Sequence, residues 1–363
     1  MLGSCDMMKE DEDLTNCGLF VNFKYDYNLQ RSDMFADHVG GVTLYVFDSD
    51  GRFVRSYEQR DIATMGRMVD GKYVHTMQIL DLPDGDYRLM ALAQQRPYDE
   101  TLTRPGAKYR RSPLAAGDDN EGFTVELDRT DSPAGTPLMV RGAIPATREA
   151  ATANTRYVSA VAPLDTLWHG MSGATPIAYK GDGHTVTTIS LTRDTKMLTI
   201  GLHNLDEGKQ LDIAASDFDI FIVDNNGKLA YNNNLLPDDN LVYTPFRTWD
   251  TQSLDAQGHP VDATAHACLT FNRLVWHEQP DENALLIIRN RTTGKEVAAI
   301  NLTDFLSQGR NAYDQFAYSR QEYLDRSYDY YMDFFIRNDI WQYAEVRINV
   351  LSWAKRIQNV TLK

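Results

Sequence analysis

Alternating apolar and polar residues run through most of the chain, and the clearest example lies near its start. In Val42–Phe47 apolar side chains fall on both faces of a period-two pattern, which predicts a β-strand that is at least partly covered on both sides. The next residues, DSDG at 48–51, predict a tight turn, because Asp tolerates left-handed backbone angles and Gly adopts them without steric cost. A return strand ending at Tyr57 completes the predicted hairpin.

The same construction recurs in the second half of the chain. Residues 218–227, FDIFIVDNNG, repeat the strand and the turn at an offset of about 176 residues. The strand predicted at Leu19–Tyr25 recurs in the same way as Met197–Leu202. A solenoid would have a much shorter period, so this repeat indicates a duplicated domain. We therefore predict two domains built on one plan.

Short strands separated by turn residues account for most of the remaining pattern. Ser32 and a Ser319–Glu322 capping box predict short helices at Asp33–Val39 and Gln321–Arg326. This spacing predicts an all-β fold: two tandem antiparallel β-sandwich domains with a few short helices. The further predicted strands are Tyr73–Ile79, Tyr87–Leu92, Phe123–Leu127, Leu138–Gly142, Thr185–Leu191, Leu285–Arg289, Val297–Ile300, and a C-terminal hairpin of Tyr330–Ile336 and Ile340–Leu362 around a turn at 337–339.

Domain boundaries follow from changes in composition. Residues 1–17 are a polar leader, 18–165 the first predicted sandwich and 166–363 the second. A linker is expected within roughly 143–183, where periodic pattern is poor and Ala, Thr, Gly and Pro are frequent. Leu167-Trp168-His169-Gly170 would then lie wedged between the domains.

The overall charge of the chain argues against one class of binding partner, nucleic acids. The chain has 51 acidic and 36 basic residues, a formal net charge of −15, which argues against nucleic-acid binding because that needs a basic surface. No apolar run reaches the length of about 18 residues that predicts a membrane-spanning helix.

The first five residues, MLGSC, have the small residues before a cysteine that end a bacterial lipoprotein signal. The charged and apolar regions of a signal peptide are missing from the sequence. The polar residues that follow, 6–13, suit a tether. We therefore expect lipidation of Cys5 in the native protein, with an ordinary N-terminal segment as the alternative.

The sequence contains no HExxH motif, glycine-rich phosphate loop or GxSxG motif. His266-Ala267-Cys268 supplies only two metal ligands. The aspartates at the two turns resemble the start of a calcium loop, but its twelfth position, a bidentate Glu, is Gln59 in one copy and Leu235 in the other. We predict no catalytic residue, cofactor or metal. We also expect Cys17 and Cys268 to be unbridged thiols, with a disulfide as the alternative in an oxidising compartment.

Aromatic residues near the C-terminus admit two interpretations. They can form a stacking platform for sugars, or they can pack within a sheet, where alternating Tyr is favourable. We favour packing. The residues concerned are Tyr323, Tyr328, Tyr330, Tyr331, Trp341 and Tyr343.

Motifs along nearly the whole chain resemble the FimB/Mfa2 family of fimbrial anchor proteins from Bacteroidales. Their order carries the resemblance, and no single motif does. One departure is Ala91-Leu92-Ala93, where relatives often carry an aromatic residue and glycines. The matching residues are Cys5, Asp13-Leu14 before Cys17, Phe23–Asn28, Leu44–Asp48 with Gly51, Leu82–Tyr87, Trp168-His169-Gly170, Gln321–Arg326, and Ile348-Asn349 with Trp353.

The resemblance implies two transthyretin-like β-sandwich domains in a surface-exposed lipoprotein of the outer membrane. It implies a non-catalytic role: to anchor a fimbria through a fimbrillin stalk subunit and to limit its length. Stalk subunits of such fimbriae assemble by strand exchange, in which an extended segment fills an open sheet edge of its neighbour.

Two hypotheses follow from this resemblance and the alternating pattern. The chain keeps its own strand Leu19–Tyr25 in place, so its groove stays closed. Its C-terminal region 346–362 offers the pairing edge to the stalk subunit, with Val346, Ile348, Val350 and Trp353 as the pairing residues. The main alternative is a surface adhesin, a fimbrial tip subunit or a glycan-binding lipoprotein. A hydrolase would need facing carboxylates in a cleft, and no pair in the sequence stands out as such.

Overall fold

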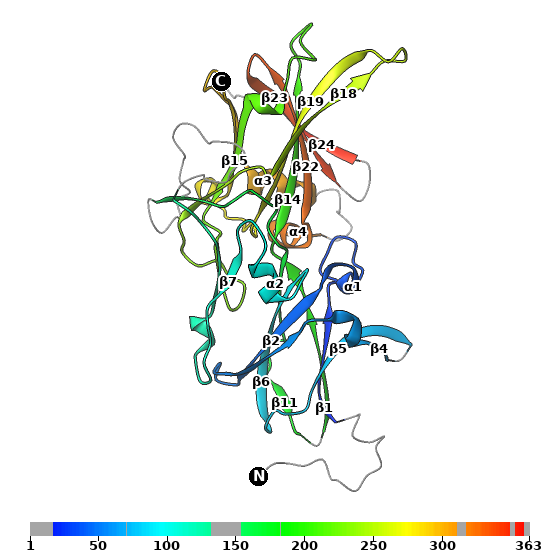
Figure 1. Ribbon diagram of the computed structural model, residues 1–363, viewed down its shortest axis with the longest axis vertical. Coiled ribbons are helices and arrows are strands. Elements are labelled where there is room, and N and C mark those ends of the chain that lie inside the picture. The colour runs from blue at the N-terminus through cyan, green and yellow to red at the C-terminus, as the bar shows by residue number, and fades with distance from the viewer. Residues whose placement is uncertain are drawn as a thin grey trace.

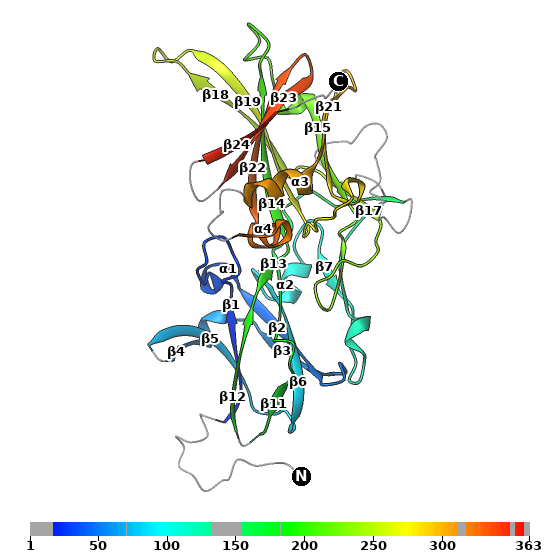
Figure 2. The same ribbon diagram turned by 180° about the vertical axis from the view of Figure 1, so that it is seen from behind.

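A computed structural model describes residues 17–69, 71–131, 154–181, 183–310, 317–348 and 353–358. The molecule is elongated, with one β-sandwich at each end (Figures 1 and 2). The all-β prediction is confirmed. The helices are short: α1 (Phe35–His38), α2 (Tyr98–Leu102), α3 (Leu302–Ser307) and α4 (Arg320–Arg326). The predicted Leu138–Gly142 strand, Cys5 and Val350 lie outside the described residues.

The first sandwich consists of two facing sheets. One has the strand order β12-β1-β5-β4, and the other β13-β10-β6-β2-β3, with β11 also paired to β6. Their core lies between β1, β2 and β6 and is built from alternate apolar residues on each strand. The strands are β1 (Gly18–Lys24), β2 (Gly41–Asp48), β3 (Phe53–Gln59), β4 (Gly66–Val69), β5 (Lys72–Ile79), β6 (Gly85–Gln94), β10 (Leu167–Met171), β11 (Ile177–Tyr179), β12 (His184–Ser190) and β13 (Thr192–Arg193).

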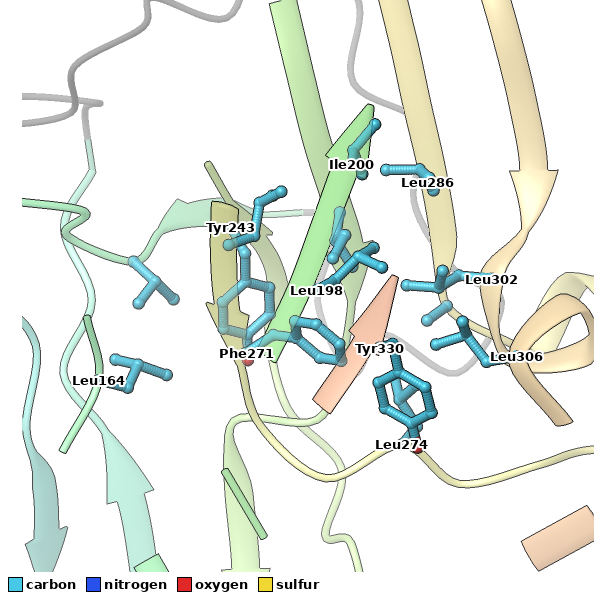
Figure 3. Packing of buried hydrophobic residues seen from close by; sticks show 14 of the residues in the cluster. Leu164, Leu198, Ile200, Tyr243, Phe271, Leu274, Leu286, Leu302, Leu306 and Tyr330 are labelled. Carbon is cyan, nitrogen blue, oxygen red and sulfur yellow. The ribbon is translucent and has the colours of Figure 1, made fainter. Parts of the chain in front are cut away.

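The second sandwich pairs a six-stranded sheet, β18-β19-β14-β22-β23-β24, with a five-stranded sheet, β21-β20-β15-β17-β9. Figure 3 shows its core, where Leu198 and Ile200 of β14 point towards Leu286 of β20. The strands are β9 (Thr155–Tyr157), β14 (Lys196–Asn204), β15 (Phe218–Asp224), β17 (Asn240–Tyr243), β18 (Arg247–Leu254), β19 (Pro260–Phe271), β20 (Leu285–Asn290), β21 (Glu296–Asn301), β22 (Asp329–Arg337), β23 (Ile340–Ile348) and β24 (Trp353–Gln358).

A three-stranded sheet joins the two sandwiches. It consists of β16 (Lys228–Ala230), β8 (Thr124–Leu127) and β7 (Tyr109–Arg111), in that order. Its apolar residues belong to the same buried cluster as the second sandwich and the outer face of β2. This explains why β2 is apolar on both sides: Val42, Leu44 and Val46 face the first core, while Tyr45 and Phe47 face the joining cluster.

Both sandwiches share one strand plan, in line with the repeat in the sequence. The order β12-β1-β5-β4 corresponds to β22-β14-β19-β18, and in each case the first pair is parallel and the others antiparallel. The order β3-β2-β6-β10 corresponds to β17-β15-β20-β21. Most strand pairs are antiparallel, as predicted, whereas β1 with β12, β14 with β22 and β9 with β17 are parallel. Long connections separate the parallel strands in the sequence, as parallel pairing requires.

The second turn differs from the first. In the first copy, Asp48 Oδ1 accepts hydrogen bonds from the backbone N–H of Asp50 and Arg52, and β2 and β3 form the predicted hairpin. In the second copy β16 pairs with β8 instead of β15, so the predicted hairpin is wrong there. Residues 224–226 are buried, and Asn226 Nδ2 donates hydrogen bonds to Asn272 O at 3.1 Å and Arg273 O at 3.0 Å.

Strand pairing also places the boundary between the sandwiches later than the sequence suggested. β10, β11 and β12 pair with β6 and β1, so residues 167–190 complete the first sandwich and do not form a linker or begin the second domain. β9, in contrast, already pairs with β17 of the second sandwich. The chain therefore crosses between the sandwiches more than once, and long-range backbone pairing of this kind leaves no trace in local composition.

The two predicted helices are present with different caps. Ser319 Oγ accepts a hydrogen bond from Glu322 N at the start of α4, as the capping box predicted. α1 is shorter than expected and Ser32 does not cap it. Asp33 Oδ1 instead accepts hydrogen bonds from Phe35 N and Tyr25 N, which ties the helix start to the end of β1.

A substitution at Gly170 of β10 tests the close packing between the two sheets of the first sandwich. A Cβ at this position would lie 2.6 Å from Ile189 Cγ2 and 2.9 Å from Ser190 O of β12. We expect Gly170→Ala to lower the free energy of unfolding by about 1–3 kcal/mol, measured by denaturant titration. Gly173→Ala is the matched control because its Cβ would meet nothing within 4 Å. Equal stability of the two variants would contradict this packing.

Candidate functional site

The pairing residues expected at the C-terminus lie on two adjacent strands. Val346 and Ile348 belong to β23, which pairs with β22 on one side and with β24 on the other. Val346 is 1% exposed and part of the core. Trp353 lies on β24, opposite Ile348. Among the described strands, β24 thus forms this end of the six-stranded sheet, and a free backbone edge at this end belongs to β24 rather than β23.

The turn between β22 and β23 is held firmly by the facing sheet. Asn338 and Asp339 both have positive φ, as a two-residue hairpin turn requires. Asn338 O accepts a hydrogen bond from Lys295 Nζ at 2.9 Å, and Asp339 Oδ1 accepts one from Asn290 Nδ2 at 3.2 Å. The hairpin, whose turn the sequence predicted, is therefore a fixed support for β24.

The aromatic residues near the C-terminus do not form one surface. Tyr323 and Tyr330 are buried in the core. On the outer face of the six-stranded sheet, Phe335 is stacked between His203 at 4.6 Å and Tyr343 at 4.4 Å between ring centroids. The faces of these rings stack against one another. The stacking stabilises neighbouring strands and leaves little ring face for a sugar.

Trp249 follows the same pattern on this outer face. It stacks on His266 at 4.9 Å, and Arg247 lies over its ring at 4.8 Å from the centroid. His266 and Cys268, considered above as metal ligands, point to this face at alternate positions of β19. No group of three His, Cys, Asp or Glu side chains suited to a metal occurs among the described residues. No disulfide joins Cys17 and Cys268, both of which lie in the described ranges.

The N-terminal strand β1 occupies its groove completely. It pairs in parallel with β12 along all of Gly18–Lys24 and antiparallel with β5 along Leu19–Phe23. Leu19, Val21 and Phe23 are fully buried. Beyond β1, Tyr25 packs edge-on against Trp168 at 5.8 Å. The predicted retention of this strand agrees with these contacts.

The second sandwich also holds the segment after β1. Arg31 Nε donates a hydrogen bond to Tyr318 Oη at 2.9 Å. Arg326 of α4 lies over the ring of Tyr27 at 4.1 Å, and Tyr328 approaches Tyr25 at 6.3 Å. Removal of β1 from its groove would break contacts in both sandwiches.

A buried polar cluster lies where β13 leads into β14. Asp194, Thr195 and Lys196 make this crossing and are almost fully buried. Lys196 Nζ donates hydrogen bonds to Asp325 O at 3.1 Å and Ser327 O at 2.8 Å, so its positive charge lies at the C-terminal end of α4. Thr195 Oγ1 lies 3.1 Å from Tyr109 Oη of the three-stranded sheet.

Charges of both signs balance within this cluster. Arg273 binds the Asp325 carboxylate through two hydrogen bonds of 2.8 and 2.9 Å. Asn233 Nδ2 donates to Asp194 Oδ1 at 2.8 Å. Burial raises the pKa of Asp194 and lowers the pKa of Lys196, because an apolar environment disfavours the charged form of each. Local sequence pattern does not predict this cluster, since a short charged run between strands usually lies in solvent.

The fold and these features define a class of protein: an all-β protein of two joined sandwiches, whose described features of interest are strand edges and a retained first strand. None of its described helices is long and apolar enough to cross a bilayer.

The family model of the fimbrillin-A associated anchor proteins Mfa1 and Mfa2 matches residues 12–359. The chain belongs to this family, which confirms the resemblance based on motifs. Family membership gives it a fimbrial anchor or adhesin role, structural rather than catalytic, in association with fimbrillins at the cell surface or envelope. No curated protein sequence matches the chain.

Solved structures support the fold. A protein described as a putative polysaccharide binding protein from Bacteroides thetaiotaomicron is 27% identical, with a TM-score of 0.66 over 94% of this chain and 98% of that chain. A putative adhesin from the same species is 23% identical, with a TM-score of 0.69 over 94% and 99%. The fimbrial anchor protein Mfa2 from Porphyromonas gingivalis is 14% identical, with a TM-score of 0.55 over 93% and 98%.

His169 of β10 makes the stability of this region depend on pH. Burial lowers the pKa of His169 to about 4, while its Nε2 lies 2.7 Å from Tyr231 O. Because the unfolded chain binds a proton near pH 6.5, stability is present above that pH and is lost as the pH falls towards 4.

We expect the wild type to lose about 2 kcal/mol more unfolding free energy than His169→Gln between pH 7.5 and pH 5, since Gln keeps a hydrogen-bond donor without the titration. Denaturant titrations of both proteins at the two pH values measure this difference. Parallel losses in the two proteins would contradict the assignment.

Proposed function

We propose that this protein is the non-catalytic subunit that ends and anchors a fimbria at the outer membrane, and so limits its length. The observation that carries this proposal is the double pairing of β1. A subunit whose groove already contains its own strand has no room in that groove for a strand from another subunit, so strand exchange through this groove stops at this protein.

The stalk contact is proposed at the other sandwich. β24 ends the six-stranded sheet, and the clamped hairpin of β22 and β23 supports it. An extended segment of a fimbrillin would add to the edge of β24 by backbone hydrogen bonds. Of the four pairing residues predicted from the sequence, Trp353 is the one described on β24.

Membrane attachment is proposed through a lipid on Cys5. The described chain begins at β1, at the end of the molecule opposite β24 (Figure 2). This arrangement would place the fimbria-binding edge away from the membrane.

A second role, as a surface adhesin, tip subunit or glycan-binding lipoprotein, has one specific observation in its favour: the similarity to the putative polysaccharide binding protein at 27% identity. Co-purification separates the two roles. An anchor isolates with a stalk fimbrillin, whereas a glycan binder isolates with polysaccharide.

Removal of residues 353–363 tests the stalk contact. We expect the truncated protein to fold, because Ala344 and Val346 of β23 keep their places in the core. Its co-purification with fimbrillin should fall at least about tenfold, since several backbone hydrogen bonds of about 1 kcal/mol each are lost. Leu254→Lys, on the opposite edge strand β18, is the control. A folded truncation that retains fimbrillin normally would overturn the proposed contact.

Cys5→Ala in the full-length precursor tests the tether. The variant cannot carry a thioether-linked lipid, so it should move from the membrane fraction to the soluble fraction, as measured by fractionation and immunoblotting. Cys17→Ala is the matched control. Retention of the Cys5 variant in the membrane would argue against the lipid anchor.

A further inference from the structure

The N-terminal sandwich has an edge strand with unusual properties, β12. It is the end strand of the order β12-β1-β5-β4, and no described strand pairs with its far side. Its seven residues, HTVTTIS, include no Asp, Glu, Lys, Arg or Pro. Its register with β1 is continuous from Gly18↔His184 to Lys24↔Ser190, without a bulge.

The other edge strands of the described sheets carry the usual protection against pairing, which is charge, a bulge or short length. β4, β24 and β18 contain charged residues, and β18 also has a bulge. β3 and β21 combine charged residues with a bulge in their pairing. β7, β9, β13 and β16 are three residues or fewer. β12 alone among these strands is long, regular and uncharged.

The second sandwich shows which kind of strand can cover the edge that corresponds to β12. β22 corresponds to β12, because each pairs in parallel with the first strand of its sandwich. The far side of β22 is covered by β23, which runs antiparallel to it. β23 places Ala344 and Val346, both almost fully buried, against the core. The equivalent position beyond β12 has no strand in the described part of the chain.

Side chains of β12 suit an edge that is empty at some times and covered at others. Thr185, Thr187 and Ile189 lie opposite the buried Leu19, Val21 and Phe23 and face inward. Thr185 and Thr187 are only half-buried, whereas the inward residues of β22 are buried and apolar. Thr combines high strand propensity with a hydroxyl that tolerates water, so the empty edge remains soluble.

We propose that β12 is an acceptor for an extended strand from a second fimbrial subunit, which adds antiparallel to it in the position that β23 occupies in the other sandwich. The incoming segment has small apolar side chains at alternate positions, as β23 has at Ala344 and Val346. It is distinct from the subunit on β24, because β12 and β24 lie in different sandwiches (Figure 2). This inference rests on the proposed fimbrial function.

A photo-crosslinking amino acid at Thr188, which is exposed on β12, tests the proposal in the full-length protein in its native, fimbriated cells. We expect a covalent adduct with a fimbrial subunit, mapped by mass spectrometry to an extended segment with small apolar side chains at alternate positions. The same substitution at Met68, 67% exposed on the opposite edge strand β4, is the control and should give no such adduct.

Substitutions at Thr187 provide a second test, in which the yield of the Thr188 crosslink is measured again. A lysine there reaches solvent while the edge is empty but is buried when a strand is added. Thr187→Lys should therefore reduce the Thr188 adduct at least about tenfold with an unchanged thermal midpoint, while Thr187→Val should keep it. An adduct only with another copy of this chain, or none above the Met68 control, would overturn the proposal.

These outcomes are distinct from failure of the proposed function. If the wild type isolates with no fimbrillin, the anchor proposal fails. If fimbrillin co-purifies but Thr188 gives no adduct, only the acceptor strand β12 is refuted.

Discussion

The parallel pairing of β1 with β12 is the interaction on which the rest of the structure depends. It closes the groove of the first sandwich, and β12 then continues through β13 into β14, the corresponding first strand of the second sandwich. The continuous segment from β12 to β14 therefore pairs with the N-terminal strand in the first sandwich and enters the core of the second. Because backbone pairing is lost along its whole length if β1 leaves, the first strand is held by many hydrogen bonds at once.

The buried charged residues between β13 and β14 fix the relative position of neighbouring elements more than they add to the free energy of unfolding. Burying an ion pair costs about as much desolvation energy as its attraction returns, so the cluster around Lys196 and Arg273 adds little net stability. Removing one member would be costly, since its partner would remain charged and buried. The cluster thus favours one relative placement of β14, α4 and the three-stranded sheet, a role we infer from its hydrogen bonds to all three.

The same physical problem, an unpaired sheet edge, is solved differently in the two copies of the sandwich. The second copy extends its sheet with β23 and β24 and ends in a strand that contains Lys355 and Arg356. The first copy ends in the uncharged β12. Duplication supplied one strand plan, and the two copies end this sheet with different strands.

The sequence by itself determined the all-β class, the repeat, the C-terminal hairpin turn and the α4 cap, because each depends on residues close together in the chain. Family motifs also pointed to the fimbrial anchors. Tertiary structure decided that residues 167–190 belong to the first sandwich, that Val346 lies in an interior strand and that the second turn is buried. It also decided that Asp194 and Lys196 meet Asn233, Asp325 and Ser327. Those outcomes depend on which distant backbone edges pair, and local pattern contains no record of that choice.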